Sequence, residues 1–197
     1  MKIFALTGGS GVGKTNVARL MRENGFYIID ADEVGHKVTD YGTQCFDELV
    51  ATFGTEIINE DGSLNRKKLG KLVFGNESKL KSLNSITHHY ILLEIKRMLK
   101  NIEEYEYVGI DGAVILGSEI EKLCQFVVVV DARSDIRLNR IKERDKISDA
   151  DAKKRLSSQP DGAFYRERAD YIIENNGAFE ELESKVKKVC TDIRNEQ

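Results

Sequence analysis

Five short apolar segments recur along the chain, and longer amphipathic stretches separate them. They are residues 3–6, 26–29, 107–110, 126–130 and 171–173. Segments of this length without polar alternation are typical of strands that are buried on both faces, as in a parallel sheet covered by helices. The pattern therefore predicts the doubly wound α/β class with a five-stranded parallel sheet.

Helices are expected between these strands. After the first strand, Val17, Ala18, Leu20 and Met21 mark one helical face, and Gly25 follows as a stop signal.

A second helix is predicted farther along the chain. It should begin near Ser148, where the spacing to Asp151 is that of a capping box. It should end at about Ser158, before Pro160.

The stretch from about residue 34 to residue 105 holds no clear strand, and its apolar residues fall at helical spacings. We expect an inserted helical subdomain there, with the core formed by residues 1–33 and 106–197. Inserted between the second and third strands, it would stand over the carboxyl edge of the sheet, where open α/β folds bind ligands. We therefore expect the helical subdomain to form the side of the site that binds a phosphate acceptor.

Composition narrows the class of protein. With 197 residues, 41% of them hydrophobic, the chain can form a globular core without disulfides or a structural metal. Its net charge of -3 gives no global positive field for nucleic acid. The three separated cysteines, Cys45, Cys124 and Cys190, fit a reducing cytosol and predict packing roles. No apolar run or signal-peptide pattern suggests a membrane, so we expect a cytoplasmic protein.

A phosphate-binding loop is predicted between the first strand and the first helix. Residues 8–15 read Gly-Gly-Ser-Gly-Val-Gly-Lys-Thr and satisfy the P-loop pattern, and this placement disfavours an incidental Gly-rich turn. Backbone N–H groups and the helix N-terminus would face the phosphates. Lys14 would reach the β and γ phosphates, and Thr15 would offer its hydroxyl to Mg²⁺. The candidate nucleotide-binding residues here are Gly9, Gly11, Val12, Gly13, Lys14, Thr15 and Asn16.

Carboxylates follow the second and third predicted strands. Asp30 and Asp32 come after the second, and we predict that Asp32 orients an attacking hydroxyl and accepts its proton. A helix N-cap at Asp32, with Asp30 beside it, is the alternative, and the spacing leaves both open. Asp111 after the third strand is a candidate Mg²⁺ ligand, directly or through water, or else a cap or turn residue.

Three arginines follow the fourth strand at spacings that place them on one helical face: Arg137, Arg140 and Arg144. They would either clamp the transferring phosphoryl group or form a solvated face paired with Asp135 and Glu143. Spacing alone favours the solvated face. Further arginines, Arg155, Arg166 and Arg168, extend the basic region into a candidate lid at about residues 140–168.

The histidines His36, His88 and His89 lack zinc-ligand spacing, so we expect no metal other than magnesium. His88 and His89 fall in a helical stretch, where a hydrogen-bonded and partly buried histidine is the default.

Together, residues 6–15 and 29–32 resemble the dephospho-CoA kinase family, in which the Thr-Gly-Gly start and the Asp-Ala-Asp motif occur together. The likeness continues through the insert, the lid and the last strand. It covers residues 53–54, 61–66, Leu69, 73–74, 83–84, His88, 140–145, Gln159, 169–173 and 175–177.

The resemblance implies a P-loop NTPase-type kinase with a lid. It would transfer the ATP γ-phosphate to the ribose 3′-hydroxyl of dephospho-CoA, the last step of CoA synthesis, with Mg²⁺. It assigns hydroxyl activation to Asp32 and the acceptor side to Arg66 and His88. It makes Arg140 and Arg144 lid residues that face phosphate, Arg140 as a catalytic residue and Arg144 as an ATP-binding residue.

The chain departs from the family pattern after the third strand, where residues 111–117 lack the usual proline and acid. His89 replaces a usual proline, Asn16 a small residue and Tyr165 a basic residue. These changes concern acceptor recognition and leave a nucleoside or nucleotide kinase of the same architecture as an alternative. Two further alternatives are a GTPase-like switch and an inactive regulator. The sequence lacks the Asn-Lys-x-Asp motif by which GTPases recognise guanine. The sequence leaves the oligomeric state open.

Overall fold

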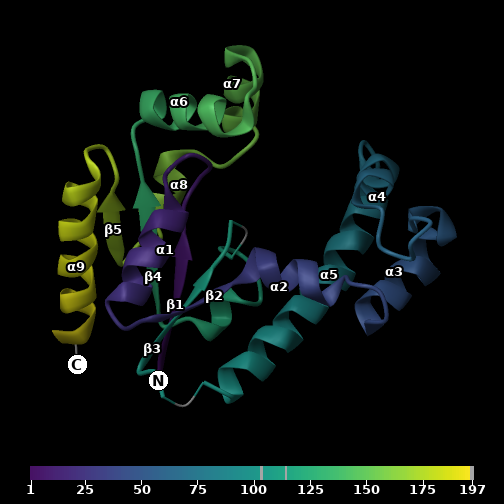
Figure 1. Ribbon diagram of the computed structural model, residues 1–197, viewed down its shortest axis with the longest axis horizontal. Helices are drawn as coiled ribbons and strands as arrows, with labels where there is room; N and C mark the ends of the chain where they lie inside the picture. Colours follow the sequence, from purple (N-terminus) through teal and green to yellow (C-terminus); the bar gives the residue numbers. More distant parts are fainter. Residues whose placement is uncertain (103, 114, 196–197) are drawn as a thin grey trace. The chain divides into compact units, whose positions relative to one another are not determined.

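The chain divides into two compact units in the computed structural model, which describes residues 1–102, 104–113 and 115–195 (Figure 1). Unit 1 comprises Met1–Ile29 and Glu103–Gln197, and unit 2 comprises Asp30–Ile102. Unit 1 therefore contains both ends of the chain, whereas unit 2 is one continuous internal segment.

The core of unit 1 is a five-stranded sheet, and its strands follow the five apolar segments. They are β1 (Lys2–Thr7), β2 (Tyr27–Asp30), β3 (Tyr107–Asp111), β4 (Phe126–Asp131) and β5 (Tyr171–Glu174). Their order in the sheet is β2-β3-β1-β4-β5. Strand β1 pairs in parallel with β3 and β4, and β4 pairs in parallel with β5. The predicted α/β class and the five-stranded parallel sheet are confirmed.

The register brings the carboxyl ends of the central strands together. Leu6 near the end of β1 stands opposite Asp111 on one side and Val128 on the other. Because β1 lies between β3 and β4, the loop that follows it opens where the strand order reverses direction. Ligands bind at such switch points in open α/β sheets.

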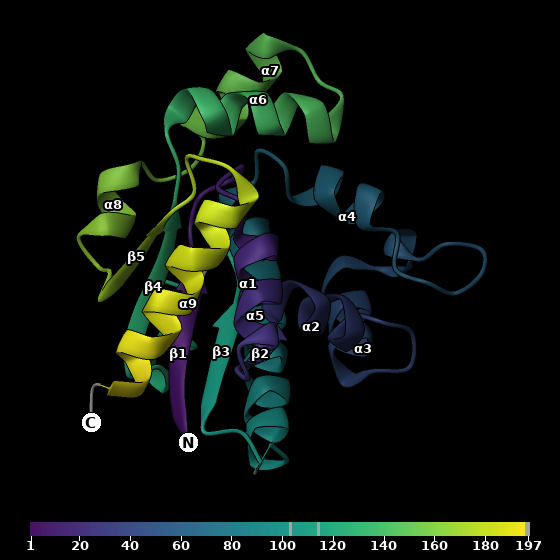
Figure 2. The same ribbon diagram turned by 60° about the vertical axis from the view of Figure 1, so that its left-hand side comes forward.

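Helices α1 (Lys14–Glu23) and α9 (Phe179–Asn195) pack side by side along the sheet (Figures 1 and 2). The four residues that marked the first predicted helix, Val17, Ala18, Leu20 and Met21, are all buried. Gly25 adopts a left-handed φ of 82° just after the helix, which confirms the predicted stop. Burying each large aliphatic or aromatic side chain contributes roughly 1.5–3 kcal/mol, so this face stabilises the unit.

The second half of unit 1 adds η2 (Glu121–Leu123), α6 (Ser134–Asp145), α7 (Asp149–Ser157) and α8 (Gly162–Arg166). The hydroxyl of Ser148 accepts a hydrogen bond from the Asp151 backbone N–H at 3.1 Å and donates to the Asp151 carboxylate at 2.6 Å. The helix expected over residues 148–158 is thereby confirmed. Helices α6 and α7 pack against each other beyond the carboxyl ends of the strands (Figure 2).

Unit 2 is built around one long helix. Its elements are α2 (Ala31–Val38), α3 (Gln44–Phe53), η1 (Thr55–Ile57), α4 (Arg66–Val73) and α5 (Glu77–Lys100). Helix α5 contacts α2, α3 and α4. Within the described part of this unit, β pairing after β2 is limited to one bridge between Ile58 and Leu64, in line with the helical pattern. The helices already begin at Ala31 rather than near residue 34, because Asp30 caps α2.

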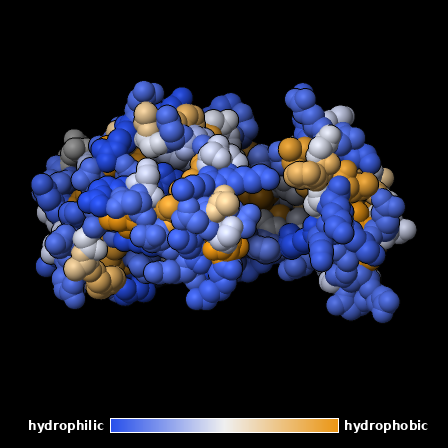
Figure 3. Space-filling view, turned by 90° about the horizontal axis from the view of Figure 1, so that it is seen from above, coloured by the Kyte–Doolittle hydropathy of each residue, from blue (hydrophilic) through white to orange (hydrophobic). Residues whose placement is uncertain are grey.

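The face of the molecule seen in Figure 3 is largely hydrophilic. Cys45 and Cys190 are buried and Cys124 is partly buried, and all three are free thiols. Burial raises the pKa of Cys45 and of Cys190 to about 11, and that of Cys124 to about 12. The predicted packing roles are confirmed for Cys45 and Cys190, which belong to the hydrophobic clusters of the two units. Among the described ranges, no helix has both the length and the apolar character required to cross a membrane.

Candidate active site

The loop between β1 and α1 has the backbone of an anion-binding site. Gly11 and Gly13 adopt left-handed φ values of 80° and 88°. Gly13, which has no side chain, is the N-cap of α1, and the first turn holds no acidic residue. In the described part of the chain, the N-cap therefore gives the N-terminal N–H groups of α1 no side-chain acceptor, and the positive end of the helix dipole favours an anion there.

Three positions of the loop require glycine because other parts of unit 1 approach the loop backbone closely and leave no room for a Cβ atom. A Cβ on Gly9 would collide with the Arg137 guanidinium, and one on Gly11 would lie 2.7 Å from the Arg137 carbonyl oxygen. A Cβ on Gly13 would collide with the Asn175 amide. Without side chains at these positions, α6 and the end of β5 can support the loop from behind.

Asn175 holds the second half of the loop and is buried, with 4% of its surface exposed. Its Nδ2 donates to the Val12 carbonyl at 2.8 Å. Arg140 donates to the Val12 carbonyl at 3.3 Å and to the Asn175 Oδ1 at 3.3 Å. Arg140 thus contacts the loop, as expected for a residue of the phosphate site. Asn175 belongs to residues 175–177, which carry part of the family resemblance, but the sequence assigned it no role in supporting the loop.

Arg137 corrects the expectation of a solvated arginine face. It is 7% exposed, and its Nε donates to the Ser10 carbonyl at 3.0 Å. The expected partner Asp135 pairs with Arg133 instead, at 2.5 Å. Helical spacing correctly placed Arg137 beside Arg140, but burial of that face depends on the loop after β1, which is distant in sequence.

Arg144 lies at the exposed end of this arginine row. Its Nε donates to Asp145 at 2.7 Å, and Arg155 also pairs with Asp145. The hydrogen bond from Arg144 lowers the pKa of Asp145. Arg144 therefore lies on a solvent-exposed helix face and pairs with a carboxylate, as the second interpretation of the arginine row predicted. Its partner is Asp145 rather than Glu143.

Lys14 and Asp111 form an ion pair in which both side chains are largely buried. Lys14 opens α1, and Asp111 ends β3, the neighbour of β1 in the sheet. The next two residues of the loop motif, Thr15 and Asn16, are exposed. The structure therefore brings the candidate phosphate lysine and the candidate magnesium carboxylate together at one edge of the sheet.

Asp30, rather than Asp32, is the N-cap of α2. The Asp30 carboxylate accepts a hydrogen bond from the Glu33 backbone N–H at 2.9 Å, and Asp32 is an exposed residue of the first turn. The alternative in which Asp32 caps the helix is wrong, because the strand ends at Asp30 and the helix begins one residue later. Asp32 is therefore not engaged in capping.

Two further candidates lie in unit 2. Arg66, the first residue of α4, is exposed and donates to the Thr39 hydroxyl at 2.7 Å. His88 and His89 lie on α5 and are exposed, so the expectation of partly buried histidines is wrong.

The candidate lid contacts the phosphate loop through one described hydrogen bond, made by Gln159. The Gln159 Oε1, between α7 and α8, accepts a hydrogen bond from the Ser10 backbone N–H at 2.8 Å. Tyr165 is 6% exposed, and burial raises its pKa while the Arg137 cation lowers it. Arg166 pairs with Asp131 at 2.6 Å and Glu174 at 2.8 Å.

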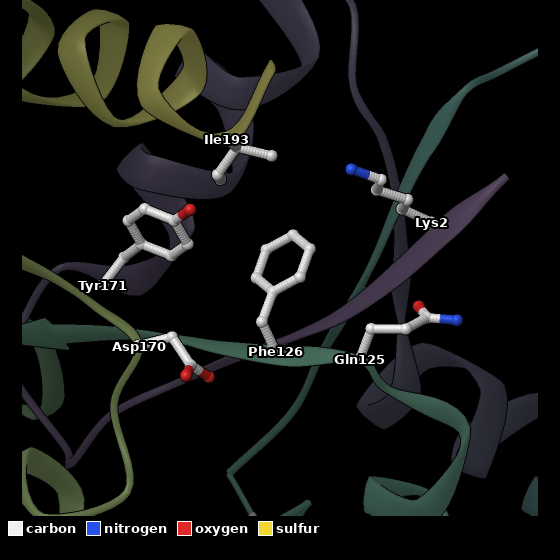
Figure 4. A pocket seen from close by; sticks show the side chains of 6 residues that line it. All are labelled: Lys2, Gln125, Phe126, Asp170, Tyr171 and Ile193. Atoms are coloured by element: carbon white, nitrogen blue, oxygen red, sulfur yellow. The ribbon is translucent and has the colours of Figure 1, made fainter. Parts of the chain in front are cut away.

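Two further features are the segment that departs from the family pattern and a pocket away from this site. The altered segment 111–117 includes Val114, which lies outside the described residues. A pocket of about 350 Å³ is lined by side chains including Lys2, Phe126 and Tyr171, which begin β1, β4 and β5 (Figure 4). It therefore lies at the amino edge of the sheet, opposite the phosphate loop.

A family model and the sequences of known proteins match this chain over most of its length. The family model described as Dephospho-CoA kinase matches residues 2–181. A dephospho-CoA kinase of Fusobacterium nucleatum is 36% identical over 97% of this chain and 98% of its own, and one of Aquifex aeolicus is 35% identical over 98% of both.

Solved structures are similar over nearly the whole chain. A Thermus thermophilus protein aligns with a TM-score of 0.83 at 26% identity, covering 98% of this chain and 97% of its own. A Campylobacter jejuni dephospho-CoA kinase aligns with a TM-score of 0.66 at 28% identity, with the same coverage. A shikimate kinase from Acinetobacter baumannii, at 18% identity and a TM-score of 0.59, covering 100% of this chain and 95% of its own, shares the fold.

Proposed function

The chain belongs to the dephospho-CoA kinase family, and from this premise we propose how its residues transfer the ATP γ-phosphate to the ribose 3′-hydroxyl of dephospho-CoA. The observation that carries the proposal is the loop before α1, whose glycines are supported from behind and whose helix terminus lacks a capping side chain. Such a loop binds phosphate through its backbone N–H groups.

The donor is held by residues of unit 1. Gly9, Gly11, Val12, Gly13 and Asn16 supply the backbone surface for the triphosphate. When ATP binds, Lys14 would leave Asp111 and contact the β and γ phosphates. The triphosphate attracts the lysine more strongly because it carries more negative charge than the single Asp111 carboxylate.

Two lid arginines are assigned to the transferred group. Arg140 is already at the loop, where its Nη1 lies 3.4 Å from the Gly11 carbonyl oxygen and 3.3 Å from the Val12 carbonyl oxygen. Arg144 would leave its exposed pair with Asp145 to contact phosphate, at low cost because exposed ion pairs contribute about 0–1 kcal/mol. Both would offset charge that spreads over the phosphoryl oxygens.

The donor set at this edge fits Mg²⁺. Thr15 and Asp111 offer a hydroxyl and a carboxylate oxygen, and no cluster of three or more histidine, cysteine or acidic side chains suited to a metal occurs among the described residues. Mg²⁺ binds oxygen ligands and completes its shell with water and substrate phosphates rather than with a protein cage. When bound, it would offset phosphate charge, with Thr15 and Asp111 as its protein contacts.

Asp32 is assigned to the acceptor hydroxyl. Its carboxylate would take the proton of the ribose 3′-hydroxyl while that oxygen forms a bond to the γ-phosphorus and ADP leaves. Support comes from the end of β2, where Asp30 takes the capping hydrogen bond and Asp32 stays exposed.

Unit 2 is assigned to acceptor binding. Arg66 would hold an anionic group of dephospho-CoA, and His88 would offer a second polar contact. Arg66 is positioned for such a role by its bond to Thr39, which fixes the guanidinium while leaving it exposed.

Product identification tests the activity directly. The chain is incubated with MgATP and dephospho-CoA, and separately with nucleosides and nucleoside monophosphates, and products are identified by mass. We expect coenzyme A and ADP from the first mixture only. Phosphorylation of nucleosides or nucleotides alone would support the other kinase class and contradict the proposal. Omitting magnesium should abolish turnover, and full activity with a chelator present would contradict the assigned metal.

A further inference from the structure

Arg137 occupies an unusual position for a cation. Its guanidinium lies against Gly9, with Cζ 3.0 Å from the position that a Cβ would take, and the side chain is 7% exposed. Its Nε donates to the Ser10 carbonyl at 3.0 Å. The charge is thus buried directly behind the first half of the phosphate loop.

No carboxylate neutralises Arg137 among the residues that the structure describes, and the Ser10 carbonyl is the acceptor found for it there. Its neighbours differ: Arg133 pairs with Asp135, and Arg144 pairs with Asp145. Burying a cation without a carboxylate partner is unfavourable, so an anion bound near Arg137 would offset part of that cost.

The remaining donors of Arg137 are not completely buried. In the described part of the chain, every fully buried side-chain nitrogen or oxygen has a hydrogen-bond partner. The Nη groups, for which no protein acceptor is found in that part, therefore keep some contact with solvent.

The peptide groups of Ser10 are held from both sides. Arg137 binds its carbonyl, and Gln159 accepts from its N–H at 2.8 Å. The two side chains come from α6 and from the turn between α7 and α8. Ser10, in the first half of the loop, is therefore held by α6 and by the candidate lid.

We propose that Arg137 is a positioning residue for the triphosphate of ATP. It holds the Ser10 peptide in the binding conformation, and its unneutralised charge attracts the phosphates to the loop. This inference rests on the proposed kinase function but concerns donor binding alone. Removing the charge of Arg137 should therefore weaken the binding of ATP more than the binding of dephospho-CoA.

The test compares Arg137→Gln, Arg137→Lys and the wild-type chain by calorimetry, with ATP and with inorganic tripolyphosphate, in the absence of acceptor. Arg133→Gln is the matched control, because Arg133 precedes the same helix and pairs with Asp135 on the surface. A charge-assisted hydrogen bond contributes about 1.5–3 kcal/mol, which corresponds to about ten- to a hundredfold in affinity. We expect that loss for both ligands in Arg137→Gln, a smaller one in Arg137→Lys, and none in Arg133→Gln.

Steady-state kinetics provide the readout that a merely structural role would not produce. The KM for ATP should rise in Arg137→Gln while the KM for dephospho-CoA stays within about twofold, since a general loss of folded structure affects both substrates. Wild-type affinity for ATP and tripolyphosphate in Arg137→Gln would overturn the proposal. If that variant does not fold, a Kd in Arg137→Lys more than about a hundredfold above wild type would overturn it, because the charge is retained.

These measurements separate the inference from the proposed function. Calorimetry with ATP or tripolyphosphate needs no turnover. A chain that binds ATP through Arg137 but does not phosphorylate dephospho-CoA would contradict the function and support the inference. If the wild-type chain makes coenzyme A and Arg137→Gln binds ATP as tightly as the wild type, the proposed function is supported and the inference about Arg137 is contradicted.

Discussion

Replacing Asn175 with alanine tests whether the phosphate loop is held from behind. The variant loses the bond from Nδ2 to the Val12 carbonyl at 2.8 Å and the bond from Arg140 to Oδ1 at 3.3 Å. The Val12 carbonyl keeps its 3.3 Å contact with Arg140 and so is not left without a donor. At about 1 kcal/mol for each net hydrogen bond, the free energy of unfolding should fall by about 2 kcal/mol.

For a chain of this size, a loss of about 2 kcal/mol lowers Tm by about 4–8 °C. The loop would also have to be ordered when ATP binds. At about 0.5–1.5 kcal/mol for each ordered group, the Kd for ATP should rise about two- to tenfold. Thermal unfolding followed by circular dichroism, and calorimetric titration with ATP, measure the two effects.

Asn176→Ala is the matched control for this prediction. Asn176 accepts one hydrogen bond from the Arg133 backbone N–H at 2.8 Å, at the start of α6. Its loss should cost about 1 kcal/mol of stability and leave ATP affinity within about twofold of wild type. An Asn175→Ala variant with a Tm within about 1 °C of wild type and an unchanged Kd would refute the supporting role.

Three further predictions concern the proposed chemistry and the buried thiols. Asp32→Asn should lower kcat by about 10²- to 10⁴-fold with the Kd for ATP little changed, because proton acceptance alone is lost; full kcat in an ADP-release assay would exclude Asp32 from the mechanism. Lys14→Ala should weaken both ATP binding and turnover, and unaltered values of both would contradict the phosphate-site assignment. Iodoacetamide at pH 8 should label Cys45, Cys124 and Cys190 slowly until urea unfolds the chain, because their pKa values are raised from 9.0 by burial. Rapid labelling of the folded chain would contradict this.

The sign of the thiol effect follows from those shifts. The folded chain disfavours the thiolate, and the pKa of each folded thiol lies above the unfolded value of 9.0. The corresponding contribution to stability is complete below pH 9 and is lost as the pH rises toward about 11 and 12. Urea unfolding at pH 8 and pH 10 measures it as a lower midpoint at the higher pH.

The amino-acid sequence by itself determined the features that depend on near neighbours in the chain. Apolar runs located all five strands, since a buried strand requires consecutive apolar residues. The helix over 148–158 followed from a serine hydroxyl and a backbone N–H three residues apart. The phosphate loop could be predicted for the same reason, because its glycines and Lys14 are contiguous.

Only the tertiary structure decided which polar side chains are buried and what they bind. Local sequence placed the possible helix cap at Asp32, and the exact end of β2 made Asp30 the cap instead. Arg137 resembled a surface residue in sequence, yet α6 packs it against a loop more than a hundred residues away. Asn175 reaches Val12 across a still longer separation. Burial and pairing of these groups arise from contacts between distant segments, and local hydrogen-bonding and periodicity rules carry no information about such contacts.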